Sequence, residues 1–295
     1  MSLTAFSIIL IILVATICGF QVLIHPYIKK YTNCYVLWLT ISIVGLIYFI
    51  FGRWMWDCIG AQHYLSTGEI LPYYSNPGID VGPWEDFFKS KSMLTDLCPF
   101  FFLGMCISLI CDRSRKIASF FCGPAIIGTI FTYAGMVFNA QNLVAINAEF
   151  IFLGRPPYRM MFILHFLNLV IAVGIWLNTP SLKWKTFLWT NVTTFSFYLY
   201  VIIMAYSFDI NHFVSGMKPG DWAEGGDYYV IGIMFKTIPF PYIIFIPLLI
   251  SYGVVSSFIC FHYLMQSKTK RYHIPNKKAK NTNVFLGYYD LKAKV

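Results

Sequence analysis

The stretch LTDLCPFFFLGMCISLIC, residues Leu94–Cys111, decides the fold. It holds a single charged side chain, Asp96, and its length is close to the roughly 20 residues that a helix needs to cross a hydrocarbon core about 30 Å thick. Six further apolar runs predict helices of the same kind: Leu3–Ile24, Tyr35–Phe51, Ile117–Phe138, Met160–Leu177, Phe187–Phe208 and Phe240–Leu264. The sequence therefore predicts an all-α, polytopic membrane protein with seven transmembrane helices.

The Lys and Arg residues gather in every second gap between these runs. The gaps 26–33, 112–116 and 179–185, together with the segment after residue 265, hold 15 of the 22 basic residues. Ten of the 13 acidic residues lie in the other three gaps. Cytoplasmic loops carry an excess of Lys and Arg. The pattern predicts an outside N-terminus, a cytoplasmic C-terminus and a multi-pass protein of the plasma membrane.

The composition is that of one transmembrane domain with a tail. Apolar residues make up 58% of the chain and charged residues 12%, far from the values of about 45–50% and about 25% in soluble domains. We expect a helical domain over residues 1–265 and a basic cytoplasmic tail over residues 266–295. The first run has no positive n-region or cleavage site, so it is expected to be a retained helix.

The tail and the cysteines bear on partners and cofactors. The basic tail is expected to bind anionic lipid headgroups, although an ordinary topology anchor explains the same charges. No specific nucleic-acid partner is predicted, and the oligomeric state stays open. The eight cysteines contain no C-x-x-C pair, so neither a metal site nor a cofactor is predicted.

Two gaps on the predicted outer side, 52–93 and 209–239, are long enough to fold over the outer mouth of the bundle. Both are rich in Trp and Tyr, which is typical of an interfacial aromatic belt. A platform for a lipid or another ligand is the alternative interpretation.

Ionisable groups inside transmembrane runs are energetically expensive, which makes Asp96 and His165 functional candidates. Both of their helices enter from the outside, so Asp96, Cys98 and His165 are expected at similar depth. Cys98 precedes Pro99 and is therefore expected at a kink or a helix start, where first-turn amides favour a thiolate. A Cys98–His165 pair of nucleophile and base follows, with plain packing of the cysteine as the alternative.

Polar residues near His165 complete the candidate site. Asn168 lies three residues further along the same helix and shares its face, so it can orient the imidazole, unless the histidine simply bonds a neighbouring carbonyl. Arg155 and Arg159 precede the histidine helix and can clamp a phosphate or carboxylate, and Asn139 and Asn142 stand in the same gap. A solvated loop is the alternative interpretation of this gap.

Three short motifs resemble the core of the YwaF-like integral membrane proteins of bacteria: Thr95–Phe101, Phe121–Pro124 and Phe162–His165. The resemblance covers about residues 93–208, with a looser likeness over 211–222. These proteins are similar to an animal polytopic acyltransferase that remodels glycerophospholipids, in which a Leu-Cys and a later histidine are the proposed nucleophile and base. Carried over, these positions are Cys98 and His165, whereas Asp96 replaces a histidine that often precedes the Leu-Cys.

The expected function is that of a lipid acyltransferase or acyl hydrolase acting near the outer leaflet. Cys98 is the expected nucleophile and His165 the general base, with Asp96 or Asn168 positioning the imidazole. One alternative is a permease or lipid carrier that uses Asp96 and His165 as a relay. Another is a non-catalytic membrane subunit. Membrane lipids are the expected partners in each case.

Overall fold

The structure is a computed structural model that describes residues 3–70, 83–138, 156–179, 184–223, 226, 228–246, 248–250, 252–253 and 256–257. These residues form helices and connecting turns, and none of them lies in a strand. The all-α class predicted from the sequence is therefore confirmed.

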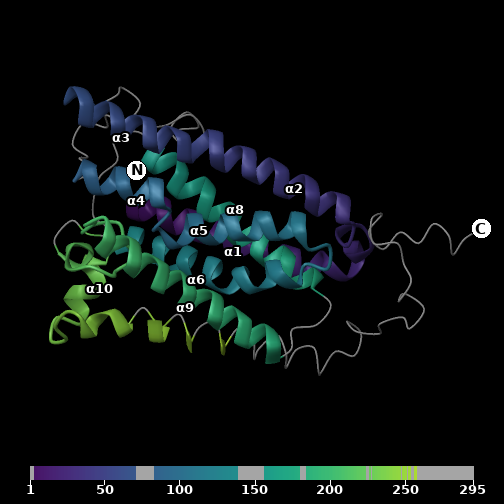
Figure 1. Cartoon of the computed structure of the whole chain (residues 1–295). Helices are drawn as coiled ribbons and strands as arrows, with labels where there is room; N and C mark the ends of the chain where they lie inside the picture. The colour runs from purple at the N-terminus through teal and green to yellow at the C-terminus, as the bar shows by residue number, and fades with distance from the viewer. Residues whose placement is uncertain are drawn as a thin grey trace, which may run out of the picture.

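The helices run roughly along one direction and form a bundle (Figure 1). Their bounds are α1 Leu3–Thr32, α2 Tyr35–Ile47, the π-helix η1 Tyr48–Trp54, α3 Met55–Thr67, α4 Trp84–Met93, α5 Leu97–Cys111, α6 Lys116–Phe138, α8 Pro156–Asn178, α9 Trp184–Ser207, the 3₁₀ turn η2 Pro219–Trp222, α10 Tyr229–Met234 and the 3₁₀ turn η3 Tyr242–Ile244.

Among the described residues, five helical stretches are long and apolar enough to cross a membrane: Ile8–Thr32, Tyr35–Thr67, Trp84–Cys111, Lys116–Tyr133 and Lys185–Ser207. A shorter apolar helix, Ile163–Asn178, corresponds to the predicted fifth run. The seventh run, Phe240–Leu264, falls partly outside the described residues. The predicted count of seven transmembrane helices therefore remains a prediction.

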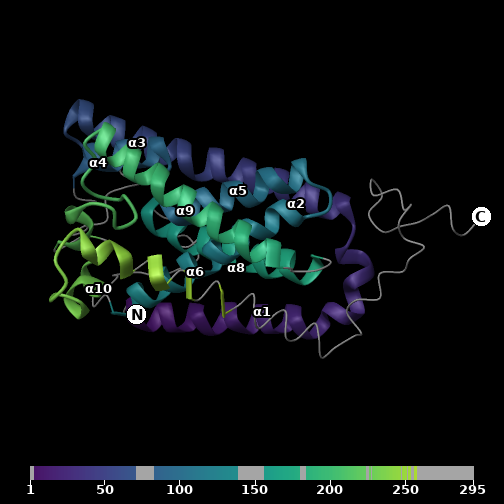
Figure 2. The same ribbon diagram turned by 60° about the horizontal axis from the view of Figure 1, so that its bottom comes forward.

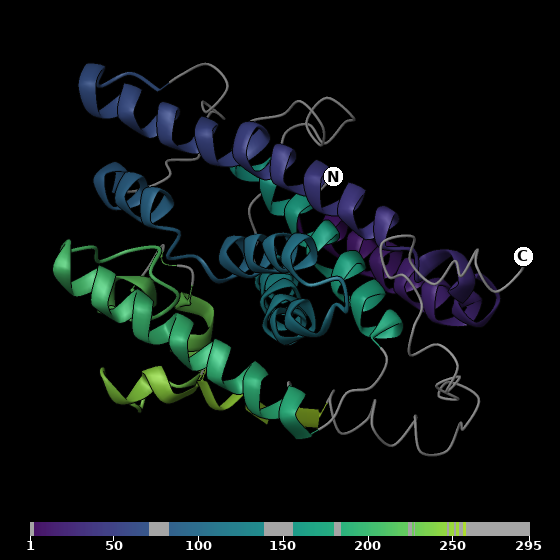
Figure 3. The ribbon, with the colours of Figure 1, turned by 45° about the vertical axis from the view of Figure 1, so that its right-hand side comes forward.

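Helices α5 and α6 form the centre of the bundle. The long helix made by α2 and α3 lies on one side of them and α9 on the other (Figure 3). Phe101, Phe102 and Met105 of α5 are fully buried there. Helix α1 lies along the edge (Figure 2) and exposes Ile12 and Leu23, as expected of a helix that faces lipid tails. Large apolar side chains thus lie on the outer surface of the bundle, which favours a location in a membrane.

One end of the bundle gathers basic residues. The α1–α2 and α5–α6 turns meet there, opposite the end that carries α4 and α10 (Figure 2). Buried Arg115 ties these turns together, since its Nη2 donates to Asn33 Oδ1 at 2.8 Å and to the Asn178 carbonyl at 3.0 Å. Thr32 also donates to Asn178 Oδ1 at 2.7 Å. We call this the basic end and the opposite one the loop end.

The structure differs from the sequence-based expectation in the first long gap, 52–93. Helix α2 does not end near Phe51 but continues through η1 and α3 to Thr67. Gly68 then ends it in the left-handed conformation (φ 73°), where its amide donates to the Tyr64 carbonyl at 2.8 Å. At about 1.5 Å per residue the combined helix is roughly 50 Å long, well over a hydrocarbon core of about 30 Å. Its last turns therefore extend beyond the core.

The second long gap folds onto the α4–α5 connection. The buried Asp221 carboxylate accepts hydrogen bonds from the amides of Phe213, Val214 and Gly216 at 2.6–3.0 Å and shapes this segment into a tight turn. The Phe213 carbonyl then accepts hydrogen bonds from Ser90 and Thr95, both at 2.8 Å. The segment 209–223 thus fixes the position at which α5 begins.

Candidate functional site

The start of α5 carries two of the predicted site residues. Asp96 is the N-cap residue, with an extended backbone (φ −79°, ψ 134°), and Leu97 is the first helical residue. Cys98 and Pro99 therefore lie in the first turn, which confirms the helix-start interpretation of the Cys-Pro pair. Proline is tolerated there because first-turn amides have no intrahelical acceptor.

The Cys98 thiol packs against α6 at a close helix–helix contact. Cys98 is 7% exposed. A methyl group on Gly128 would lie 2.7 Å from its Sγ, so only glycine leaves room for the sulfur at this point of α6. The Cys98 carbonyl accepts a hydrogen bond from Asn168 Nδ2 of α8 at 3.2 Å. Three helices thus meet at this cysteine.

His165 lies on α8, one turn before Asn168, and faces the same part of α6. It is 7% exposed, and its Nε2 lies 3.1 Å from Thr132 Oγ1. The His165 carbonyl accepts a hydrogen bond from Thr129 at 3.4 Å. Thr132 follows Gly128 by four residues, about one helical turn or 6 Å along α6. Cys98 and His165 therefore contact neighbouring positions on one face of α6.

The two residues expected to orient the imidazole contact other groups. Asn168 donates to the Cys98 carbonyl, and its Oδ1 has no hydrogen-bond partner among the described residues. The Asp96 carboxylate forms ion pairs with Lys91 and, at 4.0 Å, with Arg53 Nη2. The Asn168 amide thus holds the backbone of Cys98 in place. The Asp96 carboxylate belongs to a separate cluster of charged side chains.

None of the four predicted substrate-binding side chains lies within the described part of the structure. Asn139, Asn142 and Arg155 lie outside the described residues. Arg159 belongs to the first turn of α8, but its side chain lies outside the description as well.

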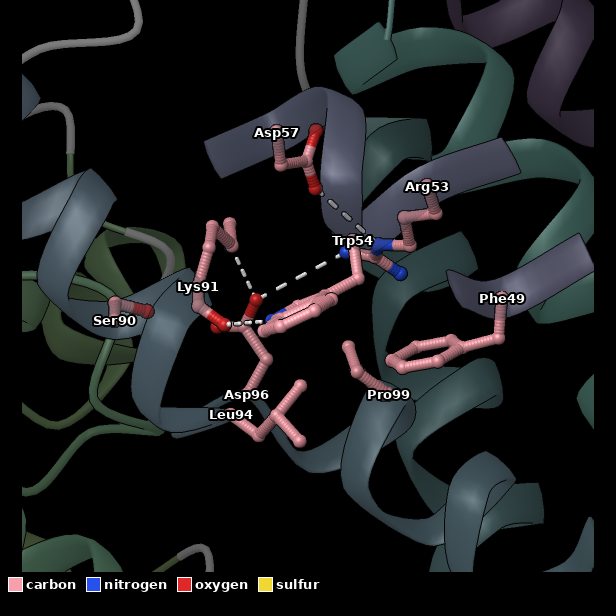
Figure 4. Close-up of a pocket in the computed structure, with 9 residues that line it drawn as sticks. All are labelled: Phe49, Arg53, Trp54, Asp57, Ser90, Lys91, Leu94, Asp96 and Pro99. Carbon is pink, nitrogen blue, oxygen red and sulfur yellow. Dashed lines mark hydrogen bonds and ion pairs between the residues drawn. The ribbon is translucent and has the colours of Figure 1, made fainter. Parts of the chain in front are cut away.

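The ionic cluster at the loop end was not anticipated from the sequence. Arg53 of η1 and Asp57 of α3 are joined by Nε and Oδ2 at 3.4 Å, and Lys91 at the end of α4 joins Asp96 (Figure 4). Arg53 is 9% exposed and Asp57 2%. Lys91 also lies over the rings of Phe87 and Phe213, 4.8 Å and 5.3 Å from their centroids. The buried Arg53 and the partly buried Lys91 thus face two carboxylates.

A small, partly open pocket with room for about one water molecule lies beside this cluster. Arg53, Asp57, Lys91 and Asp96 supply its polar lining, and Pro99 forms part of its apolar wall (Figure 4). Within the part of the chain that the structure describes, no group of three His, Cys, Asp or Glu side chains is arranged to hold a metal ion. The pocket is therefore lined by ion-paired side chains next to the first turn of α5.

A detectable signal for this cluster existed in the sequence. Arg53 and Asp57 are four residues apart, the spacing at which opposite charges pair on a helix. The apolar run ends at Phe51, so the sequence predicts no helix over these two residues on which this spacing could act. Recognising that the helix continues is what reveals the pair.

A comparison with known protein families matches nearly the whole chain to one of them. A model of a family of unknown function, DUF5378, matches residues 7–287. The chain belongs to DUF5378. The match runs from α1 past the last described helical residues and so covers α5, α6 and α8.

Two mycoplasma proteins are similar to this DUF5378 chain. Uncharacterized protein MG135 of Mycoplasma genitalium is 24% identical over 209 residues, which is 68% of each chain. The MG135 homolog of Mycoplasma pneumoniae is 23% identical over 234 residues, 78% of this chain and 79% of the relative. No solved structure matches the chain.

Proposed function

We propose that this chain is a multi-pass membrane enzyme that transfers or hydrolyses a lipid acyl group, with Cys98 as nucleophile and His165 as general base. The observation that carries the proposal is that Cys98 lies against Gly128 and His165 contacts Thr132, two positions four residues apart on one face of α6. The resemblance to YwaF-like proteins supports the same two residues.

The proposed reaction has two steps. The Cys98 sulfur attacks the acyl carbonyl of a lipid ester and loses its proton to His165. A carbon–sulfur bond forms, the ester carbon–oxygen bond breaks, and the released alcohol takes the proton from the imidazole. A lysolipid hydroxyl or water then gives its proton to His165, attacks the thioester and frees the thiolate, which is reprotonated.

The helix start contributes electrostatic stabilisation to both steps. First-turn amides of a helix lack intrahelical acceptors, and the helix dipole places positive partial charge at this end. Asn168 keeps the Cys98 backbone in place through its hydrogen bond to the carbonyl. Negative charge that develops near the sulfur is thus stabilised by groups that are already oriented.

The finer topology is part of the same proposal. Seven transmembrane helices, an outside N-terminus, a cytoplasmic C-terminus and a plasma-membrane location agree with the basic residues collected at one end of the bundle. The loop end, and with it Cys98, then lies near the outer leaflet. Membrane lipids are the proposed partners, with anionic headgroups bound by the tail.

The test is an acyl-transfer assay in proteoliposomes with two matched cysteine variants. Cys98→Ser and His165→Gln should abolish product formation and labelling by acyl-type activity probes. Cys111→Ser removes an exposed thiol at the other end of the same helix, so product formation should stay unchanged. Equal activity of the Cys98→Ser and Cys111→Ser proteins would refute catalysis at Cys98.

The carrier hypothesis keeps one supporting observation, namely the ion pairs of Asp96 with Lys91 and Arg53 at the start of α5. A carrier with a relay through Asp96 should keep its transport in the Cys98→Ser variant and lose it in Asp96→Asn. A non-catalytic subunit should be indifferent to both substitutions.

A further inference from the structure

The hydroxyl of Thr132 connects the surroundings of the two proposed catalytic residues. Its oxygen lies 3.1 Å from His165 Nε2, and the same hydroxyl donates to the Gly128 carbonyl at 2.9 Å. Gly128 is the residue of α6 against which the Cys98 sulfur packs. Thr132 therefore contacts the imidazole on one side and the backbone of Gly128 on the other.

The bond to Gly128 uses the only proton that the Thr132 hydroxyl can donate. A threonine hydroxyl has one proton and two lone pairs. In a helix it commonly donates to the carbonyl four residues earlier. Thr193 and Thr194 of α9 both do so at 2.8 Å, and the 2.9 Å contact between Thr132 and Gly128 is a bond of the same kind. Thr132 Oγ1 is then left to accept.

The contact between Thr132 and His165 consequently favours one tautomer of the imidazole. If Oγ1 accepts, Nε2 must carry the proton that it donates. The distance of 3.1 Å lies within the range of about 2.7–3.2 Å for N–H···O hydrogen bonds. A neutral imidazole has one N–H group, so Nδ1 then holds the lone pair.

Packing around the ring holds the imidazole in one orientation. His165 is 7% exposed, and the ring of Tyr133 lies against it with 6.2 Å between the centroids and a tilt of 57°. A turn of the imidazole that exchanges its two edges needs space, and a densely packed interior offers little. The nitrogen that contacts Thr132 therefore stays the same.

We propose that Thr132 is a positioning residue that accepts a hydrogen bond from Nε2–H of His165 and thereby leaves Nδ1 as the atom that takes the proton from Cys98. The tautomer does not depend on the reaction, whereas the role of Nδ1 rests on the proposed acyl transfer. When Nδ1 takes the proton, the imidazole becomes a cation and its bond to Thr132 becomes charge-assisted and stronger. Thr132 thus stabilises the protonated base rather than the bound lipid.

The first experiment measures the tautomer of the wild-type chain. The full chain with isotope-labelled histidine is reconstituted in lipid bilayers, and the nitrogen chemical shifts are recorded by solid-state NMR at a pH at which the ring is neutral. His165→Gln identifies the His165 signals among those of the six histidines. The proposal predicts a protonated Nε2 and an unprotonated Nδ1. The reverse assignment would overturn it, because Thr132 would then donate to Nε2.

Matched threonine variants of α6 separate positioning from packing. Thr132→Val keeps the shape but removes the acceptor, so the His165 shifts should change. Its kcat for acyl transfer should fall by about 10- to 100-fold, because general base catalysis contributes about 10²–10⁴-fold. KM should change by less than about twofold, since Thr132 contacts the base and not the lipid.

Two further variants are the controls. Thr132→Ser keeps the hydroxyl and should restore both the shifts and kcat. Thr129→Val removes a hydroxyl that contacts the His165 carbonyl and not the ring, so it should leave the shifts and kcat as in the wild type. The wild-type spectrum decides the tautomer even if Thr132→Val does not fold.

The two proposals fail in different ways. Unchanged His165 shifts in Thr132→Val would overturn the role of Thr132, as would a full rate in this variant beside inactive Cys98→Ser and His165→Gln proteins. The acyl-transfer proposal would then still stand. Conversely, the predicted shifts in a chain whose Cys98→Ser variant keeps full acyl transfer would support the hydrogen bond and remove the catalytic proposal.

Discussion

Replacing Gly128 with alanine perturbs the contact on which the candidate site depends. The added methyl would lie 2.4 Å from Leu97 Cδ2 and 2.7 Å from Cys98 Sγ, whereas ordinary van der Waals contact begins near 3.4 Å. The sulfur must therefore move away by about 0.7 Å or α6 must shift as a whole. The substitution thus changes the position of the thiol without removing any polar group.

The expected energetic effect is modest and the kinetic effect is large. Overpacking costs about 1–3 kcal/mol, and alanine regains about 1 kcal/mol of helix propensity over glycine. The net loss of stability is then about 0–2 kcal/mol. A displacement of about 1 Å in a reacting group can reduce a rate by roughly 10²-fold. The acyl-transfer rate should therefore fall by about 10- to 100-fold in a protein that still folds.

Two other glycines supply matched controls for the assay. Gly104→Ala meets the Phe121 ring at 2.4 Å elsewhere on α5 and should lower stability without a comparable loss of rate. Gly19→Ala has no atom within 4 Å of its new methyl and should leave stability and rate unchanged. Acyl transfer in proteoliposomes and thermal unfolding are measured for all three variants. Wild-type activity in the Gly128→Ala protein would show that the Cys98 position is irrelevant to function.

Three further predictions concern the polar contacts. Arg53→Gln alone should destabilise the protein by about 3–5 kcal/mol because it leaves the Asp57 carboxylate buried without its partner. The double variant with Asp57→Asn should lose clearly less stability. A double-mutant cycle on thermal unfolding measures the difference, and additive effects would contradict the pairing. Asn168→Leu should cost about 0.5–1.5 kcal/mol through loss of the side-chain hydrogen bond to the Cys98 carbonyl, read as a lower unfolding temperature, and an unchanged temperature would argue against this hydrogen bond. Partial burial raises the pKa of Asp112, but hydrogen bonds from the Ser114 hydroxyl and from first-turn amides outweigh it and leave the pKa below its usual value. The stabilisation by the Asp112 carboxylate is complete above the unfolded-state pKa of about 3.9 and is lost as the pH falls through the lower pKa of the folded state. Asp112→Asn should therefore flatten the acid side of a curve of stability against pH. An unchanged acid side would show that Asp112 does not contribute.

The sequence was sufficient to predict the helical class, and at Cys98 it left a kink or a helix start as the two alternatives. The apolar run from Leu94 leaves one physical solution in a membrane, and the proline after Cys98 restricts the helix start to the preceding residues. His165 and Asn168 were recognised because polar groups are rare in such runs. Their identity as candidates therefore followed from local chemistry alone.

The remaining features depended on tertiary packing that no local pattern encodes. Helix α3 follows the apolar run with polar residues, and it is held by burial of Ala61 and Asp57 rather than by hydrophobic periodicity. The contact of Asn168 with the Cys98 carbonyl depends on how closely α8 approaches α5, which in turn depends on the neighbouring glycine of α6. Local sequence patterns thus identify these side chains but not the groups that they contact.

The most direct test of the central claim is to detect an acyl group on Cys98. The purified full chain is incubated with a phospholipid, digested and analysed by mass spectrometry, with and without hydroxylamine, which cleaves thioesters. The account predicts a hydroxylamine-sensitive acyl adduct on the peptide that carries Cys98, present in Cys111→Ser and absent in Cys98→Ser. Product formation with no adduct on Cys98 at any time point would contradict it.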